Sequence, residues 1–376
     1  MKKNYISALA VLACVAVFCT ISGNSFHQMR TATEEIIPGE GVTEVRMLSD
    51  YFPDLAGTAG DTQIYVLQGE QEGGSCLILG GTHANELGGH MGAVLFVENA
   101  KVEAGTLYVI PRTNNSAFTH NDPQEGHPST VHITTDEGNV REFIHGSRAT
   151  NPVDQWPDPD VYVNYMGQSL SGSENRNINR TYPGKADGTL TEMMSYGIVQ
   201  LINTENIDVT VDLHEASPEY PVINALIAHE RAMNLASNVV VDMQMEGVQI
   251  SLEPSPTDLR GLTHRELGDH TDTLALLMEA PNPAQGRLRD RTDEALVLTG
   301  KSGTYVKAGE IGQLYVPYDE NGWPIEVRCA RHVFGIERIL ANYSEMYEEP
   351  IIVTGMPSYD ELVKNGMGPY LNEPTT

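Results

Sequence analysis

Two histidines and one glutamate follow apolar segments and are candidate metal ligands. His83 and Glu86 lie three residues apart, directly after the apolar segment 76–79 and two glycines. His214 ends another apolar segment, 207–213. Catalytic zinc is bound by histidine nitrogen and carboxylate oxygen, and it keeps one position for water. A lone His-x-x-Glu also arises by chance, and an isolated strand-end histidine more often bonds a neighbouring backbone group, so the prediction depends on the combination.

Glu279 stands where a carboxylate can act as a base. It ends the apolar segment 274–278. A carboxylate at the end of a buried strand must offset its desolvation through a partner or a raised pKa. A metal-bound water is such a partner, and taking a proton from it is the task of a general base.

The segment 175–184 offers groups that can bind a carboxylate. Asn179 and Arg180 come shortly before a Pro-Gly turn. A guanidinium group binds a carboxylate through two parallel hydrogen bonds. The alternative for Arg180 is a solvated arginine in a turn.

The composition narrows the range of partners. The chain has 376 residues with 23 Lys+Arg and 51 Asp+Glu, a formal net charge of −28, and the acidic residues are scattered. This charge disfavours nucleic acids and anionic membrane surfaces as partners. The hydrophobic fraction of 40% is ordinary for a globular protein. We expect a partner that is a small molecule or a short peptide.

Residues 1–27 have the pattern of a signal peptide or an N-terminal anchor. Lys2 and Lys3 precede an apolar run over 6–21, and small and polar residues follow. A helix of that length spans about 24 Å, a little less than the ~30 Å hydrocarbon core, which favours a cleaved signal. The protein is therefore expected to be exported, secreted or held in the cell envelope. Membrane contact is expected only through an uncleaved N-terminal segment.

Strands and helices alternate along the chain. The patterns predict strands over 62–67, 76–79, 107–110, 207–213, 222–228 and 273–278, and helices over 85–99, 230–246 and 333–343. Such alternation favours an α/β fold with a mostly parallel or mixed sheet and helices on both faces. A polar stretch without periodicity predicts a long loop insertion over 112–172.

The order of the candidate residues resembles the zinc-dependent succinylglutamate desuccinylase/aspartoacylase family of the zinc carboxypeptidase-like superfamily. Members carry Gly-x-His-x-x-Glu, Asp-Leu-Asn-Arg-x-Phe-Pro-Gly, Asp-Leu-His and a late strand that ends in Glu. The corresponding segments here are 81–86, 177–184, 212–214 and 278–279. The resemblance covers about residues 60–285 and is specific in combination.

The resemblance implies a zinc hydrolase with one zinc ion per chain. It implies the ligands His83, Glu86 and His214, the general base Glu279, and Asn179 and Arg180 as the groups that hold the substrate carboxylate. We expect the zinc-hydrolase domain over residues 40–298, including the insertion. Residues 299–376 are expected to form a β-rich or helical C-terminal extension, which is either a small β-rich lobe or a decoration of the main sheet.

The sequence departs from the family pattern at three points. Asn177 replaces the family's aspartate, and no tyrosine occurs between positions 220 and 305, where the peptidases carry one. His264 lies in that loop and is a candidate substrate-binding residue. The arginine that stabilises the transition state is not fixed by the pattern. Arg176 is preferred as the catalytic arginine, and Arg112 is the other candidate.

Three functions are compatible with these residues. The missing tyrosine and the glycine-rich C-terminal segment favour an N-acyl amino acid deacylase. The alternative is a metallo-carboxypeptidase that removes C-terminal residues from peptides. Both enzymes act on a small molecule or short peptide with a free carboxylate. The third candidate function is that of a non-catalytic binding protein.

Overall fold

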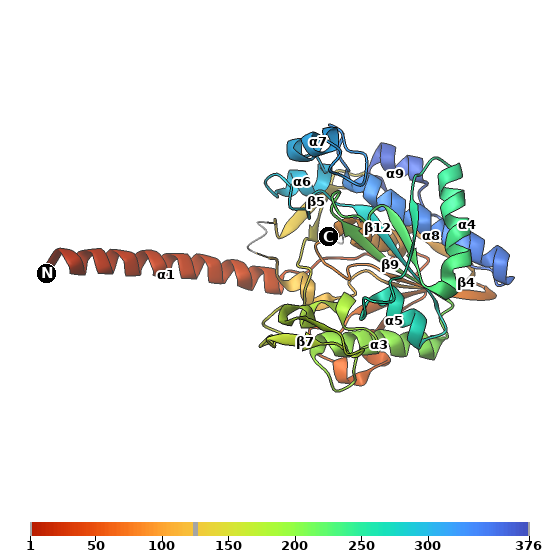
Figure 1. Cartoon of the computed structure of the whole chain (residues 1–376), viewed down its shortest axis with the longest axis horizontal. Helices are drawn as coiled ribbons and strands as arrows, with labels where there is room; N and C mark the ends of the chain where they lie inside the picture. Colours follow the sequence, from red (N-terminus) through yellow and green to blue (C-terminus); the bar gives the residue numbers. More distant parts are fainter. Residues whose placement is uncertain (1, 123–126, 375–376) are drawn as a thin grey trace.

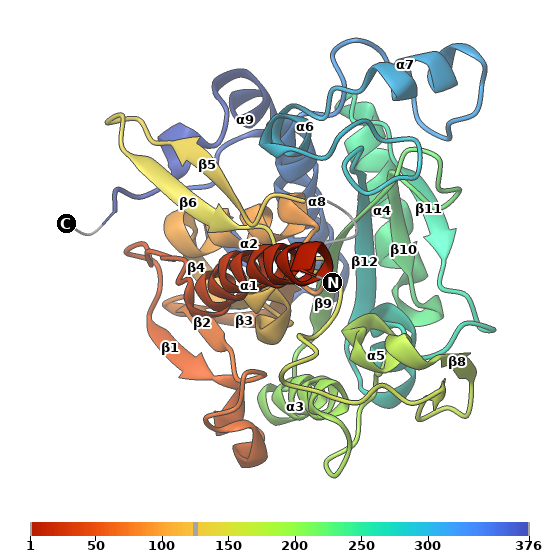
Figure 2. The same cartoon turned by 90° about the vertical axis from the view of Figure 1, so that its left-hand side faces the viewer.

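The computed structural model describes residues 2–122 and 127–374. In this part of the chain a nine-stranded mixed sheet is covered by helices on both faces, and a long helix, α1, projects away from it (Figures 1 and 2). The strand order is β1-β2-β4-β3-β9-β12-β10-β11, and β13 pairs with β4. The predicted α/β fold class is confirmed.

The elements follow the predicted alternation of strands and helices. The strands of the central sheet are β1 (Glu44–Met47), β2 (Gln63–Gln68), β3 (Gln71–Leu79), β4 (Lys101–Ile110), β9 (Val209–Ala216), β10 (Ala225–Ala228), β11 (Ser251–Pro254), β12 (Leu274–Pro281) and β13 (Ile352–Thr354). The helices are α1 (Lys2–Thr31), α2 (Leu87–Asn99), α3 (Leu190–Glu205), α4 (Met233–Met245), α5 (Thr263–His270), α6 (Glu294–Thr299), α7 (Gly303–Glu310), α8 (Ile325–Tyr347) and α9 (Tyr359–Asn365).

Alternate side chains of β3 pack against opposite helix layers. Cys76 and Ile78 belong to the larger core cluster, which also contains apolar side chains of α2, α4 and α8. Leu77 and Leu79 belong to a second cluster with side chains of α3. Because successive side chains of a strand point to opposite faces, both faces of the sheet are buried.

The strand order brings the candidate site residues to one edge of the sheet. β9 and β12 are parallel neighbours, and His214 is the register partner of Glu279. β3 is parallel to β9 on its other side, and the turn after β3 carries His83 and Glu86. The carboxyl ends of neighbouring parallel strands lie at the same edge of a sheet, so the three segments meet there.

The C-terminal extension differs from the expected β-rich lobe. The described residues 299–374 are mainly helical, and their one strand, β13, joins the central sheet at β4. The glycine-rich part over 300–318 supplies helix caps and turns instead of strands. Gly300 ends α6 with a φ of 59°, and the Ser302 side chain accepts a hydrogen bond from the backbone N–H of Tyr305 at the start of α7.

Helix α8 ties this extension to the site edge of the sheet. Arg328 on α8 and Glu215, the residue after His214, form an ion pair with Nη1 2.9 Å from Oε1. Both side chains are fully buried. The C-terminal residues therefore complete the core of the α/β unit.

The Arg328–Glu215 pair gives a testable prediction about stability. Arg328→Met leaves the Glu215 carboxylate buried without its cation, so the free energy of unfolding should fall by about 3–5 kcal/mol. Urea denaturation would measure this change. Lys101→Met, which breaks an exposed ion pair with Glu40, is the control and should stay close to wild type. Equal stability of Arg328→Met and wild type would contradict the structural role of the pair.

The insertion over 112–172 contains more structure than the predicted loop. It includes two two-stranded antiparallel sheets, β5 (Thr130–Thr134) with β6 (Val140–Ile144) and β7 (Val161–Val163) with β8 (Ser169–Ser171). These strands escaped prediction because each is only three to five residues long, too short for its alternation to stand out from the polar residues around it.

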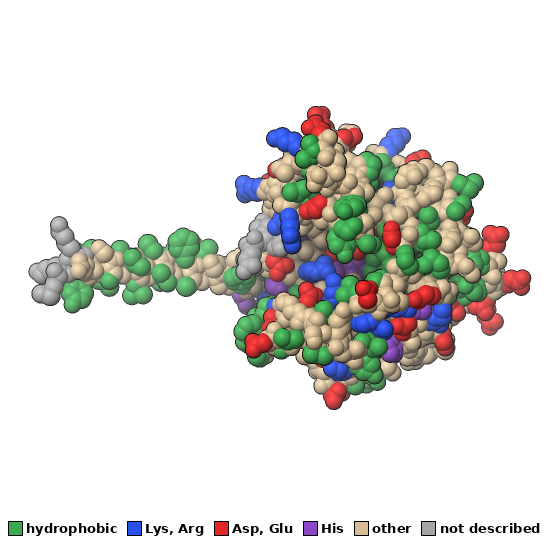
Figure 3. Space-filling view, viewed as in Figure 1, with side chains coloured by type: hydrophobic (Ala, Val, Ile, Leu, Met, Phe, Trp, Pro, Cys, Tyr) green, Lys and Arg blue, Asp and Glu red, His purple; other side chains and the backbone are tan. Residues whose placement is uncertain are grey.

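Helix α1 is apolar along most of its length. Over Asn4–Thr31 it is long and apolar enough to cross a membrane, and none of its apolar window is buried (Figure 3). At its end, the Arg30 guanidinium is 2.7 Å from the Asp154 carboxylate of the insertion. This helix fits the predicted signal or anchor.

Candidate active site

His83, Glu86 and His214 meet beyond the carboxyl ends of β3 and β9. Glu86 Oε1 lies 2.7 Å from His83 Nδ1, and Glu86 Oε2 lies 2.9 Å from His214 Nδ1. All three side chains are buried, and one ligand atom of each lies within 4.8 Å of the others. Two imidazole nitrogens and a carboxylate form the donor set of catalytic zinc sites with an open position. The residues therefore fit a Zn²⁺ ion, and we call them the triad.

A second layer of polar groups orients the two imidazoles. Asp212 Oδ2 is 2.8 Å from His214 Nε2, and the Thr82 hydroxyl donates to Asp212 Oδ1 at 2.6 Å. Asn177 Oδ1 is 3.0 Å from His83 Nε2. Each histidine thus places Nε2 against an acceptor and keeps Nδ1 toward Glu86. Such partners fix the orientation of metal-binding histidines.

The charges of the triad are set by burial and by mutual contacts. Burial lowers the pKa of His83 to about 4, and Arg148 adds to this effect. Burial alone would lower the pKa of His214, but Asp212 and Glu86 raise it well above its usual value. Burial alone would raise the pKa of Glu86, but the two histidines hold it well below its usual value. In the metal-free protein Glu86 is therefore charged and His214 protonated, so metal binding releases that proton.

Asn177 bridges His83 and Glu174 through its side-chain amide. Its Oδ1 faces His83, while its Nδ2 donates to Glu174 Oε2 at 2.8 Å. An aspartate at this position would repel Glu174. The contact with Glu174 therefore favours asparagine over aspartate at this position.

Removing the acceptor at Asn177 should weaken metal binding. Asn177→Leu leaves His83 Nε2 without a partner, and we expect the affinity for Zn²⁺ to fall about 10–100-fold. Competition with a chromogenic chelator would measure it. Asn177→Asp keeps an acceptor for His83 although its charge lies near Glu174, so it should retain more of the affinity than Asn177→Leu. An unchanged affinity of Asn177→Leu would argue against the orienting role.

Glu279 lies beside the triad with a free oxygen. In the described part of the chain, its buried Oε2 has no hydrogen-bond partner. Burial raises the pKa of Glu279 to about 8, with Glu86 adding to the shift and His214 opposing it. A cation at the triad would lower this pKa. A carboxyl group that titrates near neutrality can both accept and return a proton.

The triad opens into a cavity of about 410 Å³. In Figure 3, arginine or lysine side chains and histidine lie together in a hollow near the middle of the face shown. The polar lining includes His83, Glu86, His214, Glu279, Arg148, Asn179, Arg180 and His264. The structure therefore brings together seven of the nine residues that the sequence predicted, and adds Arg148.

Asn179 and Arg180 belong to a short 3-10 turn on the cavity wall. Asn179 Oδ1 accepts hydrogen bonds from the backbone N–H and the hydroxyl of Thr263, at 2.8 and 3.0 Å. Arg180 Nη1 donates to the Asn179 carbonyl at 2.6 Å, and its nearest carboxylate, Glu174, lies 3.8 Å away. Burial lowers the pKa of Arg180, and Arg148 adds to this effect. Two neighbouring cations in a cavity favour an anionic ligand.

The structure places Arg112 and Arg176 away from this cavity. Arg176 forms a two-pronged ion pair with Asp158, at 2.7 and 2.9 Å. Arg112 is half-buried beside Tyr65 and Asn115, with its guanidinium 4.6 Å from the centre of the Phe118 ring. Neither of these two arginines lines the cavity.

Arg148, from the insertion, is the arginine that approaches the triad. Its Nη1 is 3.5 Å from both Glu86 Oε1 and His83 Nδ1, and its side chain is 43% exposed. No local pattern predicts this position of Arg148, because the insertion has no periodicity and the contact depends on how the insertion folds.

His264 lines the cavity at the start of α5. Its Nδ1 is 2.8 Å from the Ser255 hydroxyl, and burial lowers its pKa to about 3. His264 is therefore a neutral polar group that faces the substrate space.

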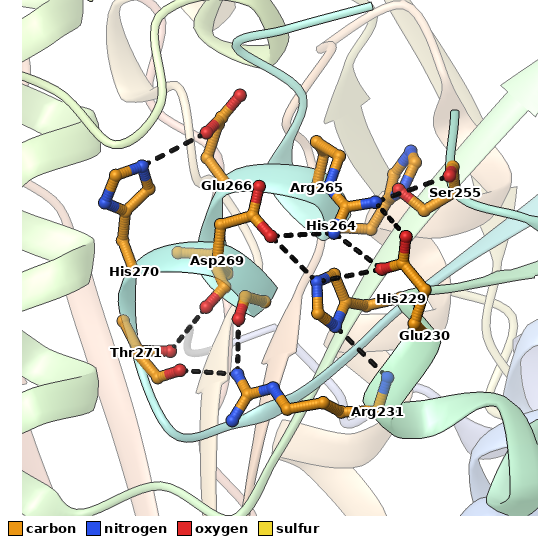
Figure 4. Close-up of polar contacts among 12 residues, drawn as sticks. His229, Glu230, Arg231, Ser255, His264, Arg265, Glu266, Asp269, His270 and Thr271 are labelled. Carbon is orange, nitrogen blue, oxygen red and sulfur yellow. Dashed lines mark hydrogen bonds and ion pairs between the residues drawn. The ribbon is translucent and has the colours of Figure 1, made fainter. Parts of the chain in front are cut away.

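A charged network holds α5 in place behind His264 (Figure 4). Arg265 contacts Glu230 at 2.6 Å and Asp269 at 2.7 Å, and Asp269 is 3.0 Å from His229. These contacts join α5 to the turn after β10, so the network fixes the helix that presents His264 to the cavity.

A tyrosine reaches the cavity from an unexpected loop. Tyr220 follows β9 and belongs to the cavity lining, although its side chain is 49% exposed. The loop before β12, where the peptidases carry a tyrosine, supplies Leu259, Leu262 and His264 instead.

Comparisons with known proteins find structural neighbours only. No protein-family model matches the sequence, and no curated protein does. Among solved structures, a succinylglutamate desuccinylase from Silicibacter shares 15% identity, over 76% of this chain and 61% of that chain, with a TM-score of 0.42. The product-bound ectoine utilization protein EutE from Ruegeria pomeroyi shares 16% identity, over 74% of this chain and 60% of that chain, with a TM-score of 0.41.

A metallo-carboxypeptidase from Burkholderia cenocepacia shares 12% identity, over 81% of this chain and 66% of that chain, with a TM-score of 0.45. This chain thus spans about three fifths of the length of the first two neighbours. Desuccinylase/aspartoacylase and metallo-carboxypeptidase structures are both among these neighbours. The function proposed below rests on the residues of the site.

Proposed function

We propose that the protein is a zinc-dependent hydrolase that cleaves an amide bond in a substrate with a free carboxylate. The first candidate is an N-acyl amino acid deacylase. The observation that carries the proposal is a buried His83–Glu86–His214 triad that opens into a cavity with an unpartnered carboxylate and two cationic side chains. A binding protein would not need that carboxylate.

Each residue of the site has a chemical task in this proposal. His83, Glu86 and His214 would hold Zn²⁺, which supplies a Lewis acid and lowers the pKa of a bound water. Glu279 accepts a proton from the attacking water at Oε2 and returns it to the leaving nitrogen.

The cationic groups act on the substrate. Arg148 donates hydrogen bonds to the carbonyl oxygen as negative charge develops on it. Arg180 binds the substrate carboxylate and, with His264 and the turn braced by Asn179, fixes the scissile bond near the triad.

Tyr220 favours a second candidate, a metallo-carboxypeptidase. The absence of a tyrosine in the loop before β12 and the glycine-rich C-terminal segment favour a deacylase. Tyr220 now supplies a phenol at the cavity, and the lobe is helical. The same Arg180 would then bind the C-terminal carboxylate of a peptide.

The test uses the full chain in detergent, loaded with Zn²⁺ and mixed with N-acyl amino acids and short peptides. Mass spectrometry identifies the products, and a chelated sample is the control. Release of free acid and amino acid supports the deacylase, whereas loss of single C-terminal residues supports the carboxypeptidase. If the metal-loaded protein cleaves neither set of substrates, a non-catalytic binding protein is the remaining candidate.

The location of the protein is part of the same proposal. We propose an exported protein, secreted or held in the cell envelope, since α1 has the length and composition of a signal or anchor. N-terminal sequencing of the protein from its native host would tell a cleaved signal from a retained anchor.

A further inference from the structure

The cavity has an apolar floor that the mechanism does not use. Ala225 and Ile227 of β10 and Leu277 of β12 form a small hydrophobic cluster with Val222, separate from the two main cores. Ile227 and Leu277 are 4% and 2% exposed and line the cavity. This floor extends from the triad toward the edge of the sheet, so it can receive the apolar part of a substrate.

A carboxylate stands at the far end of this floor. The strand registers align Leu277 with Ile227, and Ile227 with Glu253 on the edge strand β11. Glu253 also lines the cavity. Because neighbouring strands are about 4.8 Å apart, Glu253 lies about 10 Å across the sheet from the strand of Glu279.

The Glu253 side chain is half-buried and has no partner. Over residues 2–122 and 127–374, its carboxylate forms neither an ion pair nor a hydrogen bond with another side chain or backbone group. Its neighbours in the cavity are apolar, such as Ile227, Pro254 and Leu259. A half-buried carboxylate beside apolar groups is stabilised most by a cation, which here can come only from a ligand or from solvent.

The cavity is therefore polarised along its length. Arg148 and Arg180 lie at the triad end and attract a carboxylate, while Glu253 at the other end attracts a cation. With Zn²⁺ bound at the triad, the charge of Glu86 would be offset, and the two arginines would repel a cation from that end. A ligand with an anionic and a cationic group would bind in one orientation only.

We propose that Glu253 binds the cationic end of the substrate. The preferred substrate is an amide whose amine-side amino acid has an aliphatic side chain that ends in an ammonium or guanidinium group. This inference rests on the proposed function. It holds for either branch, because the amine-side residue is the amino acid of an N-acyl compound or the last residue of a peptide.

The test compares two substrates that differ in one charge. Nα-acetyl-lysine and Nα-acetyl-norleucine share the side-chain stem, and only the first carries an ammonium group. For the Zn²⁺-loaded full chain, we expect kcat/KM to favour the lysine compound at least tenfold. Glu253→Gln should lower this ratio tenfold or more, and Glu253→Lys should favour Nα-acetyl-glutamate over the lysine compound.

Asp258→Asn is the matched control. It removes one negative charge from the exposed loop that follows β11, outside the cavity lining, and should keep the wild-type ratio. A wild-type ratio near one, or an equal ratio in Glu253→Gln, would overturn the proposal. An equal fall of the ratio in Asp258→Asn would overturn it too, because the effect would then come from overall charge.

A binding measurement separates this proposal from the proposed function. Titration calorimetry of free lysine and free norleucine on the same Zn²⁺-loaded protein needs no turnover. Tighter binding of lysine that is lost in Glu253→Gln supports the site even if no amide is cleaved. Equal binding of both amino acids, with hydrolysis intact, would overturn the role of Glu253 as the cation-binding group. The proposed hydrolase function would then still stand.

Discussion

Glu279→Gln should retain the metal and lose most of the turnover. Glutamine has nearly the same shape and cannot accept a proton, so kcat should fall about 10²–10⁴-fold, the range of general-base catalysis. The triad itself is unchanged, because Glu279 makes no contact that orients His83, Glu86 or His214. Steady-state kinetics and elemental analysis on the same preparation would measure both quantities.

His83→Ala is the variant to set beside it. It removes a ligand, so both the metal and the activity should be lost. The two variants thus separate loss of metal from loss of the base. If Glu279→Gln kept its activity within tenfold of wild type, Glu279 would not be the proton acceptor, and its buried free oxygen would need another explanation.

Residues at strand ends could be predicted because their place follows from the sheet. His214 and Glu279 end apolar segments, and such segments become parallel neighbours in an α/β sheet. The short spacing between His83 and Glu86 keeps them in one turn after β3. In each case a local pattern predicts that the residue lies at the end of a strand. The pairing of the strands then brings these residues together.

The arginines could not be placed in this way. Arg176 was preferred because it is near Asn179 in sequence, yet it faces Asp158 of the insertion. Arg148 lies 31 positions before Asn179 and reaches the triad only because the insertion folds over it. Long-range contacts of an irregular segment leave no periodic signal in the sequence.

The sequence did not decide between a β-rich and a helical C-terminal extension, for a related reason. Glycine occurs both in turns between strands and at helix ends, and here Gly300 ends a helix. The start of α8 was also missed, since Arg328, Arg331 and His332 are polar and yet buried there. The two arginines have partners in distant parts of the chain, Glu215 for Arg328 and the backbone carbonyl of Gln249 for Arg331. A hydrophobic pattern cannot identify a core position that an ion pair fills.

Arg148→Met should lower kcat about 10²–10³-fold while KM changes less. Methionine keeps much of the length of the side chain and removes the donors that stabilise charge on the carbonyl oxygen. The guanidinium is partly exposed, and its closest charged partner, Glu86, lies 3.5 Å away, so it can turn toward a substrate. Steady-state kinetics with the substrate found in the product screen would measure both constants.

Two further variants show whether this role is the right one. Arg180→Met should have the opposite pattern, a raised KM, because Arg180 binds the ground-state carboxylate as strongly as the transition state. Arg148→Met also removes a positive charge next to Glu86 and His83, so its affinity for Zn²⁺ should equal or exceed that of wild type. A fall in activity with the metal still bound would therefore reflect a slower chemical step and not a loss of the metal. A raised KM with an unchanged kcat would instead make Arg148 a second carboxylate-binding group, and the cavity would then need another donor for the developing charge.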